Sequence, residues 1–175
     1  MPFKPTPLAG VQIFDPRTFA DERGYFFESF NARTFNEAGI NDVFVQDNEA
    51  SSTRGVLRGL HFQRGEAAQS KLVRVVVGEV YDVVVDLRPD SPTLHHWYGA
   101  YLSEHNHRQL YVPRGFAHGY LVTSERAIFC YKCDNFYAPE HEGGLRYDDP
   151  KLGIQWPVVG SEYVVAAKDQ AWGPL

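Results

Sequence analysis

The stretch RGLHFQ, residues 58–63, carries three chemically capable side chains inside a run that otherwise reads as an apolar strand. Arg58 can bind anions, His61 can exchange a proton near neutral pH, and Gln63 can donate and accept hydrogen bonds. A guanidinium and an imidazole lower the stability of a buried strand unless they meet a partner or a ligand. Lys71 adds a second cation at the start of the next predicted strand. These residues predict a polar site inside the fold.

Arg58 and His61 are three positions apart, so strict strand alternation would point them to opposite faces. Two interpretations follow. Either a β-bulge at Gly59 turns one of them so that both reach one site, or Arg58 serves a different surface.

A second candidate stretch is PRGFAHGY, Pro113–Tyr120, in which a tight turn leads into a strand that carries His118. This spacing resembles the second motif of the cupin barrels. Metal-binding cupins have His-x-His and a Glu in their first motif, whereas this chain has His61-Phe62-Gln63 there, with only Glu66 nearby. We therefore expect no metal site. A weak one from His61, Gln63, Glu66 and His118 is the alternative.

The remaining reactive side chains are assigned no role. The histidine clusters HHW (95–97) and EHNHR (104–108) lie among polar residues near turns and read as solvated surface. Cys130 and Cys133 form one CxxC on a predicted strand, where they point to opposite faces, and no second pair completes a zinc site. We interpret them as two reduced thiols of a cytoplasmic protein.

The elements that must position these residues read mainly as short strands. The chain has 175 residues with twelve Phe and ten Tyr, and this composition favours one domain, residues 1–175, rich in β structure. Turn residues separate candidate strands at 11–14, 24–30, 43–50, 56–62, 71–77, 79–86, 97–102, 109–112, 118–122 and 127–134. One short helix is predicted near 31–38, capped by Asn31 and ended by Gly39. The pattern predicts a sandwich or barrel.

Alternation along these strands repeatedly places polar groups on faces that should be buried. The residues that share a face are Phe26 and Glu28; Phe44, Gln46 and Asn48; Asp82 and Asp86; and Phe129, Tyr131 and Cys133. A β-barrel whose interior holds a polar ligand accounts for this pattern. Arg23, Arg58, Lys71 and Lys168, if gathered in one pocket, would suit a diphosphate.

The totals exclude several classes of function. A net charge of −5 disfavours a broad nucleic-acid-binding surface. The first ten residues lack the apolar segment of a secretory signal, and no stretch approaches the length of a membrane span, so we expect a cytoplasmic protein without membrane attachment.

Taken together, the motifs resemble those of the sugar-nucleotide 3,5-epimerases of the dTDP-L-rhamnose pathway. The resemblance covers nearly the whole chain. It runs from FDPRTFADERGYFFESF through QDNEASSTRGVLRGLHFQ, KLVRVVVGEVYDVVVDLRPDSPT, VPRGFAHGYLV and YKCDNFYAPEHEGGLRYDDPKLGIQWP to AAKD. The chain departs from the family at SPTLHHW, where the family usually has an aromatic residue and a glycine before the tryptophan.

The resemblance implies an all-β, cupin-type β-barrel (jelly roll) with a few short peripheral helices. It implies a homodimer with shared active sites, in which N-terminal strands are exchanged. By the same resemblance His61 is the general base, Asp169 its orienting carboxylate, Tyr131 the opposing acid, and Lys71 the cation near the carbonyl oxygen of the substrate. The implied substrate contacts are Arg23, Phe26, Glu28, Gln46, Asn48, Arg58, His118 and Lys168.

The implied activity is cofactor-independent isomerisation of dTDP-4-dehydro-6-deoxy-D-glucose to dTDP-4-dehydro-L-rhamnose, by epimerisation at C3 and C5. The alternatives are a 3-only or 5-only epimerase of a related nucleotide-activated 4-keto sugar, a metal-dependent cupin enzyme, and a non-catalytic sugar-binding barrel. The sequence does not distinguish which carbons are inverted or which nucleotide base is preferred.

Overall fold

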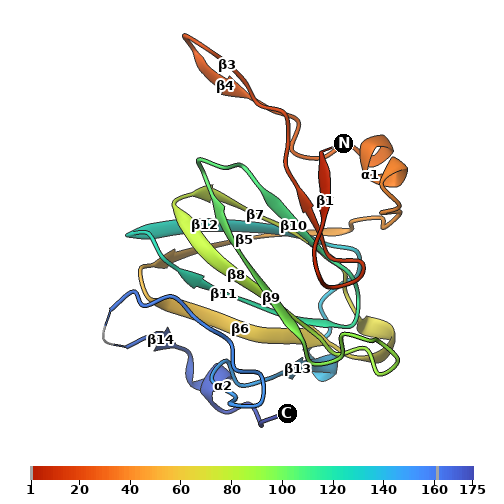
Figure 1. Ribbon diagram of the computed structural model, residues 1–175, viewed down its shortest axis with the longest axis vertical. Coiled ribbons are helices and arrows are strands. Elements are labelled where there is room, and N and C mark those ends of the chain that lie inside the picture. Colours follow the sequence, from red (N-terminus) through yellow and green to blue (C-terminus); the bar gives the residue numbers. More distant parts are fainter. Residues whose placement is uncertain (1, 161) are drawn as a thin grey trace.

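Two β-sheets packed face to face form the body of the protein, shown as a computed structural model in Figure 1. The structure describes residues 2–160 and 162–175. The first sheet has the spatial order β1 (Phe3–Pro5), β2 (Gln12–Phe14), β10 (Gln109–Val112), β7 (Lys71–Val77), β12 (Arg126–Cys133) and β5 (Gln46–Thr53). The second has the order β13 (Glu142–Gly144), β6 (Val56–Gln63), β11 (Phe116–Val122), β8 (Glu79–Asp86) and β9 (Trp97–Ser103), and β14 (Val164–Val165) also pairs with β6.

The remaining elements are short and peripheral. A separate hairpin consists of β3 (Phe19–Asp21) and β4 (Gly24–Phe26), the α-helices are α1 (Ala32–Glu37) and α2 (Ala167–Gln170), and single 3₁₀ turns occur at η1 (Gly65–Ala67) and η2 (Pro139–His141). The fold is therefore the predicted all-β, cupin-type barrel with a few short helices. Within the described residues, none of the helices has the length and apolar composition that a membrane span requires.

The core has three parts, and alternation along the strands decides which residues enter each. Val73, Val80, Val84, Leu110 and Phe129 point between the two sheets and form the centre of the largest part. The opposite face of the second sheet packs against the C-terminal segment, which lies beneath β6 in Figure 1. The third part packs α1 onto the edge of the first sheet.

Helix α1 follows the predicted 31–38 closely. The Asn31 side chain accepts a hydrogen bond from the Arg33 backbone N–H, and the helix ends before Gly39, whose φ of +84° suits glycine. Phe35 is the buried residue of the helix and contacts the rings of Phe3, Phe14 and Phe30. Because only Phe35 enters the core, a six-residue helix is enough to cover this edge.

Most predicted strands agree with the structure, and two differ. The strand predicted at 43–50 lies at Gln46–Thr53 (β5) instead. Its pairing with β12 runs from Gln46 opposite Cys133 to Thr53 opposite Arg126, and this pairing includes the mostly polar stretch EASST in the sheet. The predicted 24–30 ends at Phe26, since β4 pairs only with β3. Glu28 therefore lies outside the strand, and the Ser29 carbonyl beyond it accepts a 2.7 Å hydrogen bond from the Gln109 side chain.

The hairpin β3–β4 extends away from the two sheets, at the end opposite the C-terminal segment (Figure 1). It exposes Tyr25 at 59% and Phe26 at 69%. Tyr25 and Phe27 pack on the ring of His107, with centroids 4.6 and 4.8 Å away, so the base of the hairpin is held against the loop between β9 and β10. Its tip is left without a contact of this kind in the described chain.

Candidate active site

A cavity between the two sheets has two adjoining lobes that share the side chains of His61, Lys71 and Tyr131. We call them the Arg58 lobe, of about 530 Å³, and the Gln46 lobe, of about 340 Å³. The Arg58 lobe is lined further by Ala50, Val56, Leu57, Arg58, His118, Gly119, Tyr120, Phe129, Val164, Val165, Ala166, Lys168 and Asp169. The Gln46 lobe is lined further by Gln46, Asn48, Phe62, Gln63, Gln69, Cys133, Tyr137 and Glu142.

Arg58 and His61 both reach this cavity because β6 contains a bulge. His118 of β11 lies opposite His61, and Tyr120 lies opposite Arg58, so three steps on β6 match two on β11. The bulge includes Gly59, whose φ of +129° suits glycine and whose Cα lies against Gly119. Of the two interpretations, the structure supports a bulge at Gly59, which brings both side chains to one side of the strand.

His61 is held by a carboxylate from the C-terminal segment. Its Nε2 lies 2.7 Å from Oδ1 of Asp169, and Oδ2 accepts a 3.1 Å hydrogen bond from the backbone N–H of Gly59. Asp169 is only 4% exposed. Burial alone would raise its pKa, but the hydrogen bond and the charge of His61, together with the Gly59 N–H, outweigh that effect and lower it. The carboxylate therefore stays ionised and fixes the imidazole through one ring nitrogen.

Tyr131 and Lys71 face His61 from the other sheet. Tyr131 lies on β12 opposite Val73, and Lys71 lies at the start of β7 opposite Cys133. Burial raises the pKa of Tyr131, so its phenol stays protonated, and burial lowers the pKa of Lys71. The cavity therefore has a histidine with a carboxylate on one wall, and a phenol and an amine on the other.

A second histidine–carboxylate pair lies in the same wall as His61. His118 Nε2 is 2.9 and 3.0 Å from the two oxygens of Asp82, and both residues are buried. Burial raises the pKa of Asp82 although the neighbouring His118 acts against it. The contact with Asp82 fixes the orientation of the His118 ring through Nε2, and His118 lines the cavity.

The Gln46 lobe is bordered by a polar chain. The Gln46 amide donates to Asn48 Oδ1 at 3.0 Å and its Oε1 accepts from the Tyr137 backbone N–H at 3.0 Å. The Tyr137 hydroxyl donates to Glu142 at 2.9 Å, and Lys168 donates to the same carboxylate oxygen at 2.5 Å. This chain connects the loop before η2 with helix α2 across the edge of the cavity.

The sequence profile of dTDP-4-dehydrorhamnose 3,5-epimerase matches residues 5–175. The chain belongs to the dTDP-4-dehydrorhamnose 3,5-epimerase family. It is 50% identical over 174 residues to the dTDP-4-dehydrorhamnose 3,5-epimerase of Methanothermobacter thermautotrophicus, covering 99% of this chain and 94% of that protein.

Solved structures agree with this membership. A dTDP-6-deoxy-D-glucose-3,5-epimerase from Legionella pneumophila, in complex with dTDP-4-keto-L-rhamnose, has a TM-score of 0.93 and 47% identity over 97% of this chain and 90% of that one. ChmJ, a 3'-monoepimerase from Streptomyces bikiniensis in complex with dTDP-quinovose, has a TM-score of 0.91 and 31% identity over 97% and 86%. The fold is thus that of a family with both double and single epimerases among its relatives.

In this epimerase-family chain, nine of the twelve predicted site residues line the cavity. They are Gln46, Asn48, Arg58, His61, Lys71, His118, Tyr131, Lys168 and Asp169. The other three, Arg23, Phe26 and Glu28, lie on or next to the hairpin, are exposed, and do not reach the cavity of their own chain. Arg23 instead pairs with Asp21 beside the hairpin turn.

Four polar residues of the site were assigned no role from the sequence. Alternation already placed Asp82 on a face that should be buried, where a carboxylate needs a partner, but it did not identify that partner as His118. Glu142 stands in the polar stretch APEHEGG, where nothing distinguishes it from a surface residue, and its role as the partner of Lys168 depends on tertiary contacts alone. Ser52 and Tyr120, which lie beside Arg58, carry no local signal either.

Two of the four residues named as alternative metal ligands, Gln63 and Glu66, are not placed to bind a metal ion together with His61 and His118. Gln63 Oε1 accepts from the Ala138 backbone N–H at 3.1 Å, and Glu66 is exposed on η1 outside both lobes. Across residues 2–160 and 162–175, no three His, Cys, Asp or Glu side chains gather in a geometry that could hold a metal ion.

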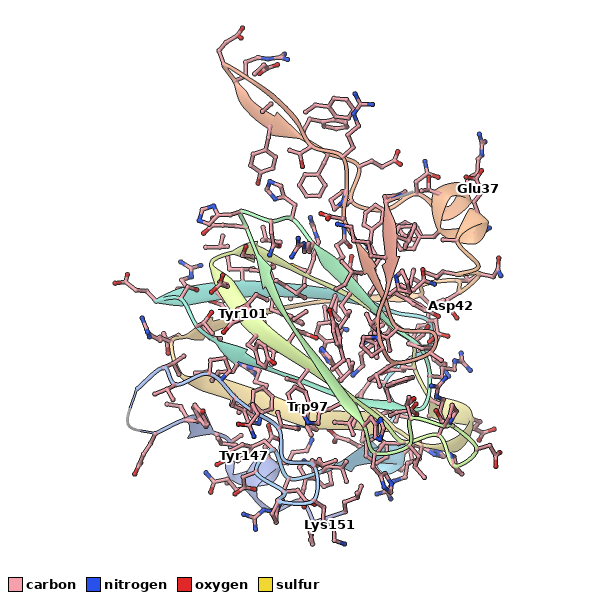
Figure 2. The ribbon with its side chains drawn as sticks, in the orientation of Figure 1. Glu37, Asp42, Trp97, Tyr101, Tyr147 and Lys151 are labelled. Atoms are coloured by element: carbon pink, nitrogen blue, oxygen red, sulfur yellow. The ribbon has the colours of Figure 1, made fainter. Side chains whose placement is uncertain are left out.

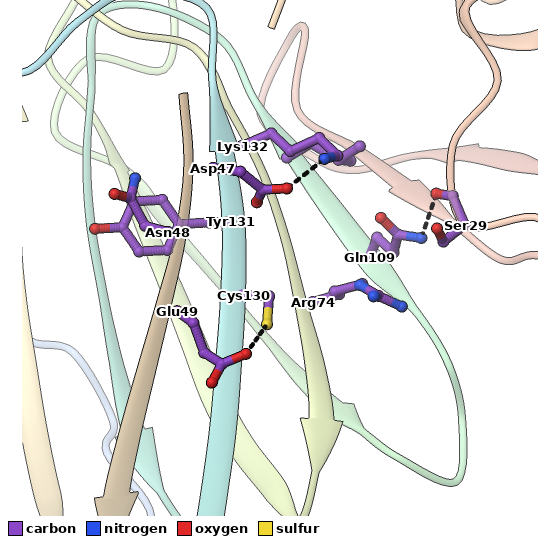
Figure 3. A pocket seen from close by; sticks show the side chains of 10 residues that line it. Ser29, Asp47, Asn48, Glu49, Arg74, Gln109, Cys130, Tyr131 and Lys132 are labelled. Atoms are coloured by element: carbon purple, nitrogen blue, oxygen red, sulfur yellow. Dashed lines mark hydrogen bonds and ion pairs between the residues drawn. The ribbon is translucent and has the colours of Figure 1, made fainter. Parts of the chain in front are cut away.

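The opposite face of the first sheet carries a separate hollow of about 330 Å³, shown in Figure 3. Asp47 pairs with Lys132 at 2.6 Å, and Cys130 lies 3.7 Å from Glu49. Cys130 and Cys133 are both free thiols, as predicted. The lining of this hollow contains no histidine, so it has no set of groups comparable with those around His61.

Proposed function

We propose that this protein epimerises C3 and C5 of dTDP-4-dehydro-6-deoxy-D-glucose and yields dTDP-4-dehydro-L-rhamnose. The observation that supports this most directly is the placement of His61, held by Asp169, across one cavity from Tyr131 and Lys71. A base and an acid on facing walls are what the inversion of a carbon next to a ketone requires.

The reaction begins with proton removal by neutral His61. A proton on C3 or C5 is acidic because the C4 ketone of the substrate accepts the electron pair, so the chemistry needs no further electron sink. Asp169 fixes the ring of His61 and stabilises the imidazolium that forms. The C–H electron pair moves into the enolate, and its negative charge collects on the C4 oxygen.

Lys71 and Tyr131 complete the step. Lys71 stabilises the developing charge on the C4 oxygen in a cavity where burial strengthens electrostatic interactions. Tyr131, protonated because burial raises its pKa, delivers a proton to the opposite face of the carbon. The carbon then has the inverted configuration. His61 releases its proton to solvent and Tyr131 regains one, after which the second centre follows the same course.

The sugar nucleotide is bound by the cations and amides of the two lobes. Arg58 and Lys168 contact the diphosphate, His118 contacts the sugar, and Gln46 and Asn48 make further contacts with the substrate. Arg23, Phe26 and Glu28 are supplied by a second copy of the chain, so that a homodimer has two shared sites. Residues 1–175 act as one domain, and the protein works in the cytoplasm.

The test is incubation with dTDP-4-dehydro-6-deoxy-D-glucose in deuterated water, followed by NMR of the sugar. Deuterium at both C3 and C5 is expected, and both signals should disappear with His61→Ala. His96→Ala, which changes an exposed histidine outside the cavity, is the matched control and should retain both. Label at one carbon only would identify a 3-only or 5-only epimerase. If the wild-type protein introduced no deuterium into the sugar, the proposal would be contradicted.

A further inference from the structure

The Arg58 lobe contains a buried hydroxyl that the proposed chemistry does not use. Tyr120 lines this lobe from β11 and is only 5% exposed. Its ring stacks on Phe129 with centroids 4.0 Å apart and planes at 16°, which fixes the direction of the hydroxyl. Phenylalanine would fill the same space and make the same stack, so the hydroxyl needs a separate explanation.

The hydroxyl of Tyr120 makes no hydrogen bond of good geometry among the residues that the structure describes, and the Ser52 Oγ beside it already accepts from Arg58 Nε. Burial raises its pKa to about 12, while Arg58 and Ser52, both beside it, act in the opposite direction. The group is therefore a protonated donor at neutral pH. A buried donor without an acceptor destabilises a fold, and native proteins rarely keep one that nothing satisfies.

Its neighbour Arg58 is also short of acceptors. Nε of Arg58 donates to Ser52 Oγ at 3.1 Å, which orients the guanidinium. In the described chain, the two terminal nitrogens of that guanidinium have no hydrogen bond or ion pair. Arg58 and Tyr120 thus both have donors without a protein acceptor of good geometry in one lobe, so this part of the lobe is complementary to a ligand group that offers acceptors.

We propose that the Tyr120 hydroxyl binds the substrate directly, by donating a hydrogen bond to an oxygen that it shares with Arg58. The inference rests on the proposed function, because the ligand is the sugar nucleotide, and it adds a residue to that site. The acceptor is an oxygen of either the diphosphate or the hexose. The stacked ring leaves the donor fixed before the substrate arrives, so little conformational entropy is lost when it binds.

The test is Tyr120→Phe, which removes the hydroxyl and keeps the stack on Phe129. Tyr101→Phe is the matched control, since Tyr101 of β9 (labelled in Figure 2) lines neither lobe. Binding of dTDP and of dTDP-glucose is measured by calorimetry, together with thermal unfolding. We expect Tyr120→Phe to weaken binding by about three- to tenfold and to leave the melting temperature equal or higher, because the unpaired hydroxyl is gone.

The two ligands identify the acceptor. Equal weakening for dTDP and dTDP-glucose assigns the bond to the diphosphate, and weakening for dTDP-glucose alone assigns it to the hexose. Unchanged binding of both by Tyr120→Phe, with normal binding by the wild-type protein, would overturn the role of Tyr120 and leave the proposed function intact. No binding of either ligand by the wild-type protein would overturn both.

Discussion

At the scale of single residues, the local environment sets the protonation state of each titratable group in the cavity. Asp169 is kept ionised by its contacts with His61 and Gly59, whereas Tyr131 is kept protonated by burial. A base partner and a proton donor therefore coexist in one cavity at the same pH. Tyr131 and Lys71 lead to separate predictions, since in the proposed mechanism Tyr131 donates a proton and Lys71 stabilises negative charge.

Tyr131→Phe is expected to uncouple proton removal from inversion. The base His61 remains, so deuterium should still enter the sugar from the His61 side, while net epimerisation falls by roughly 10²–10⁴-fold because the opposite face has lost its donor. Deuterium uptake and product formation are followed in the same NMR experiment. Equal loss of the two rates would assign Tyr131 to packing or substrate positioning instead.

Lys71→Met is expected to lower activity and raise stability. Burial lowers the pKa of Lys71 in the folded protein, so its charge destabilises the fold fully at pH values below that lowered pKa, and this cost fades as the pH rises from there to the ordinary pKa of lysine in the unfolded chain. Near neutral pH the variant should be more stable by about 1 kcal/mol, and the difference should shrink in alkali.

The activity of Lys71→Met should fall by about 10²–10³-fold, as for the loss of a group that stabilises an oxyanion. Urea unfolding at two pH values and the rate of epimerisation measure the two effects. Lys151→Met, at an exposed lysine of the C-terminal region (Figure 2), is the control and should change neither by much. A less stable Lys71→Met protein would contradict the cost assigned to the buried charge.

At the scale of elements, the bulge in β6 does the positioning. It turns Arg58 and His61 to one side, and its Gly59 N–H also holds Asp169. Helix α2 contributes the Asp169 carboxylate. Trp172, just after this helix, packs on Gly144 of β13, which is the residue paired with His61. Three short elements therefore determine the geometry of one histidine.

Gly59→Ala is expected to disrupt this arrangement. A Cβ at Gly59 would lie 2.5 Å from Gly119 Cα and 2.9 Å from the His118 carbonyl oxygen, so β6 and β11 would have to separate. We expect a loss of at least about 2 kcal/mol in the free energy of unfolding, with epimerisation reduced because His61 shifts relative to Asp169.

Gly39→Ala is the matched control for Gly59→Ala. Gly39 also has a positive φ, of +84°, but a Cβ there would meet no atom within 4 Å. It should cost only the roughly 1–2 kcal/mol of the left-handed conformation and keep full activity. Urea unfolding and steady-state rates compare the pair, and equal losses of stability would refute the close packing of Gly59 on Gly119.

At the scale of the whole molecule, the hairpin β3–β4 is the part that a single chain leaves unexplained. It exposes Phe19, Tyr25 and Phe26, and it carries Arg23 away from the cavity of its own chain. An exposed aromatic hairpin with free strand edges favours aggregation unless another surface covers it. A second copy of the chain that receives the hairpin beside its cavity would remove the hazard and complete the site.

A mixing experiment tests this arrangement. Chains with Phe26→Ala and Glu28→Ala are refolded together with chains carrying His61→Ala. If sites are shared, each heterodimer has one fully native site, because both lesions fall in its other site. Random pairing of equal amounts makes about half of the dimers heterodimers, so activity should return to about a quarter of the wild-type level. Each variant refolded alone is the control. No recovery, or a monomer in light scattering at micromolar concentration, would contradict shared sites.

The sequence by itself determined the class of fold and most of the wall residues. Strand alternation is local, so 71–77, 79–86 and 109–112 were predicted with the bounds of β7, β8 and β10. The glycine in RGLHFQ made a bulge one of two interpretations, and the structure decided between them, because the positive φ of Gly59 and its close approach to Gly119 depend on the pairing of β6 with β11. The roles of His61, Tyr131 and Lys71 came from the resemblance to a family and remain predictions until variants are measured.

Only the tertiary structure decided which side chains meet. His61 and Asp169 are 108 residues apart and Tyr137 and Gln46 are 91 apart, and no periodicity along the chain relates positions so distant. The extension of β5 to Thr53 depended on pairing with β12, and the pairing of Glu142 with Lys168 depended on the path of the C-terminal segment. Local patterns specify the face on which a residue lies, whereas the partner it finds there is set by how the sheets close on one another.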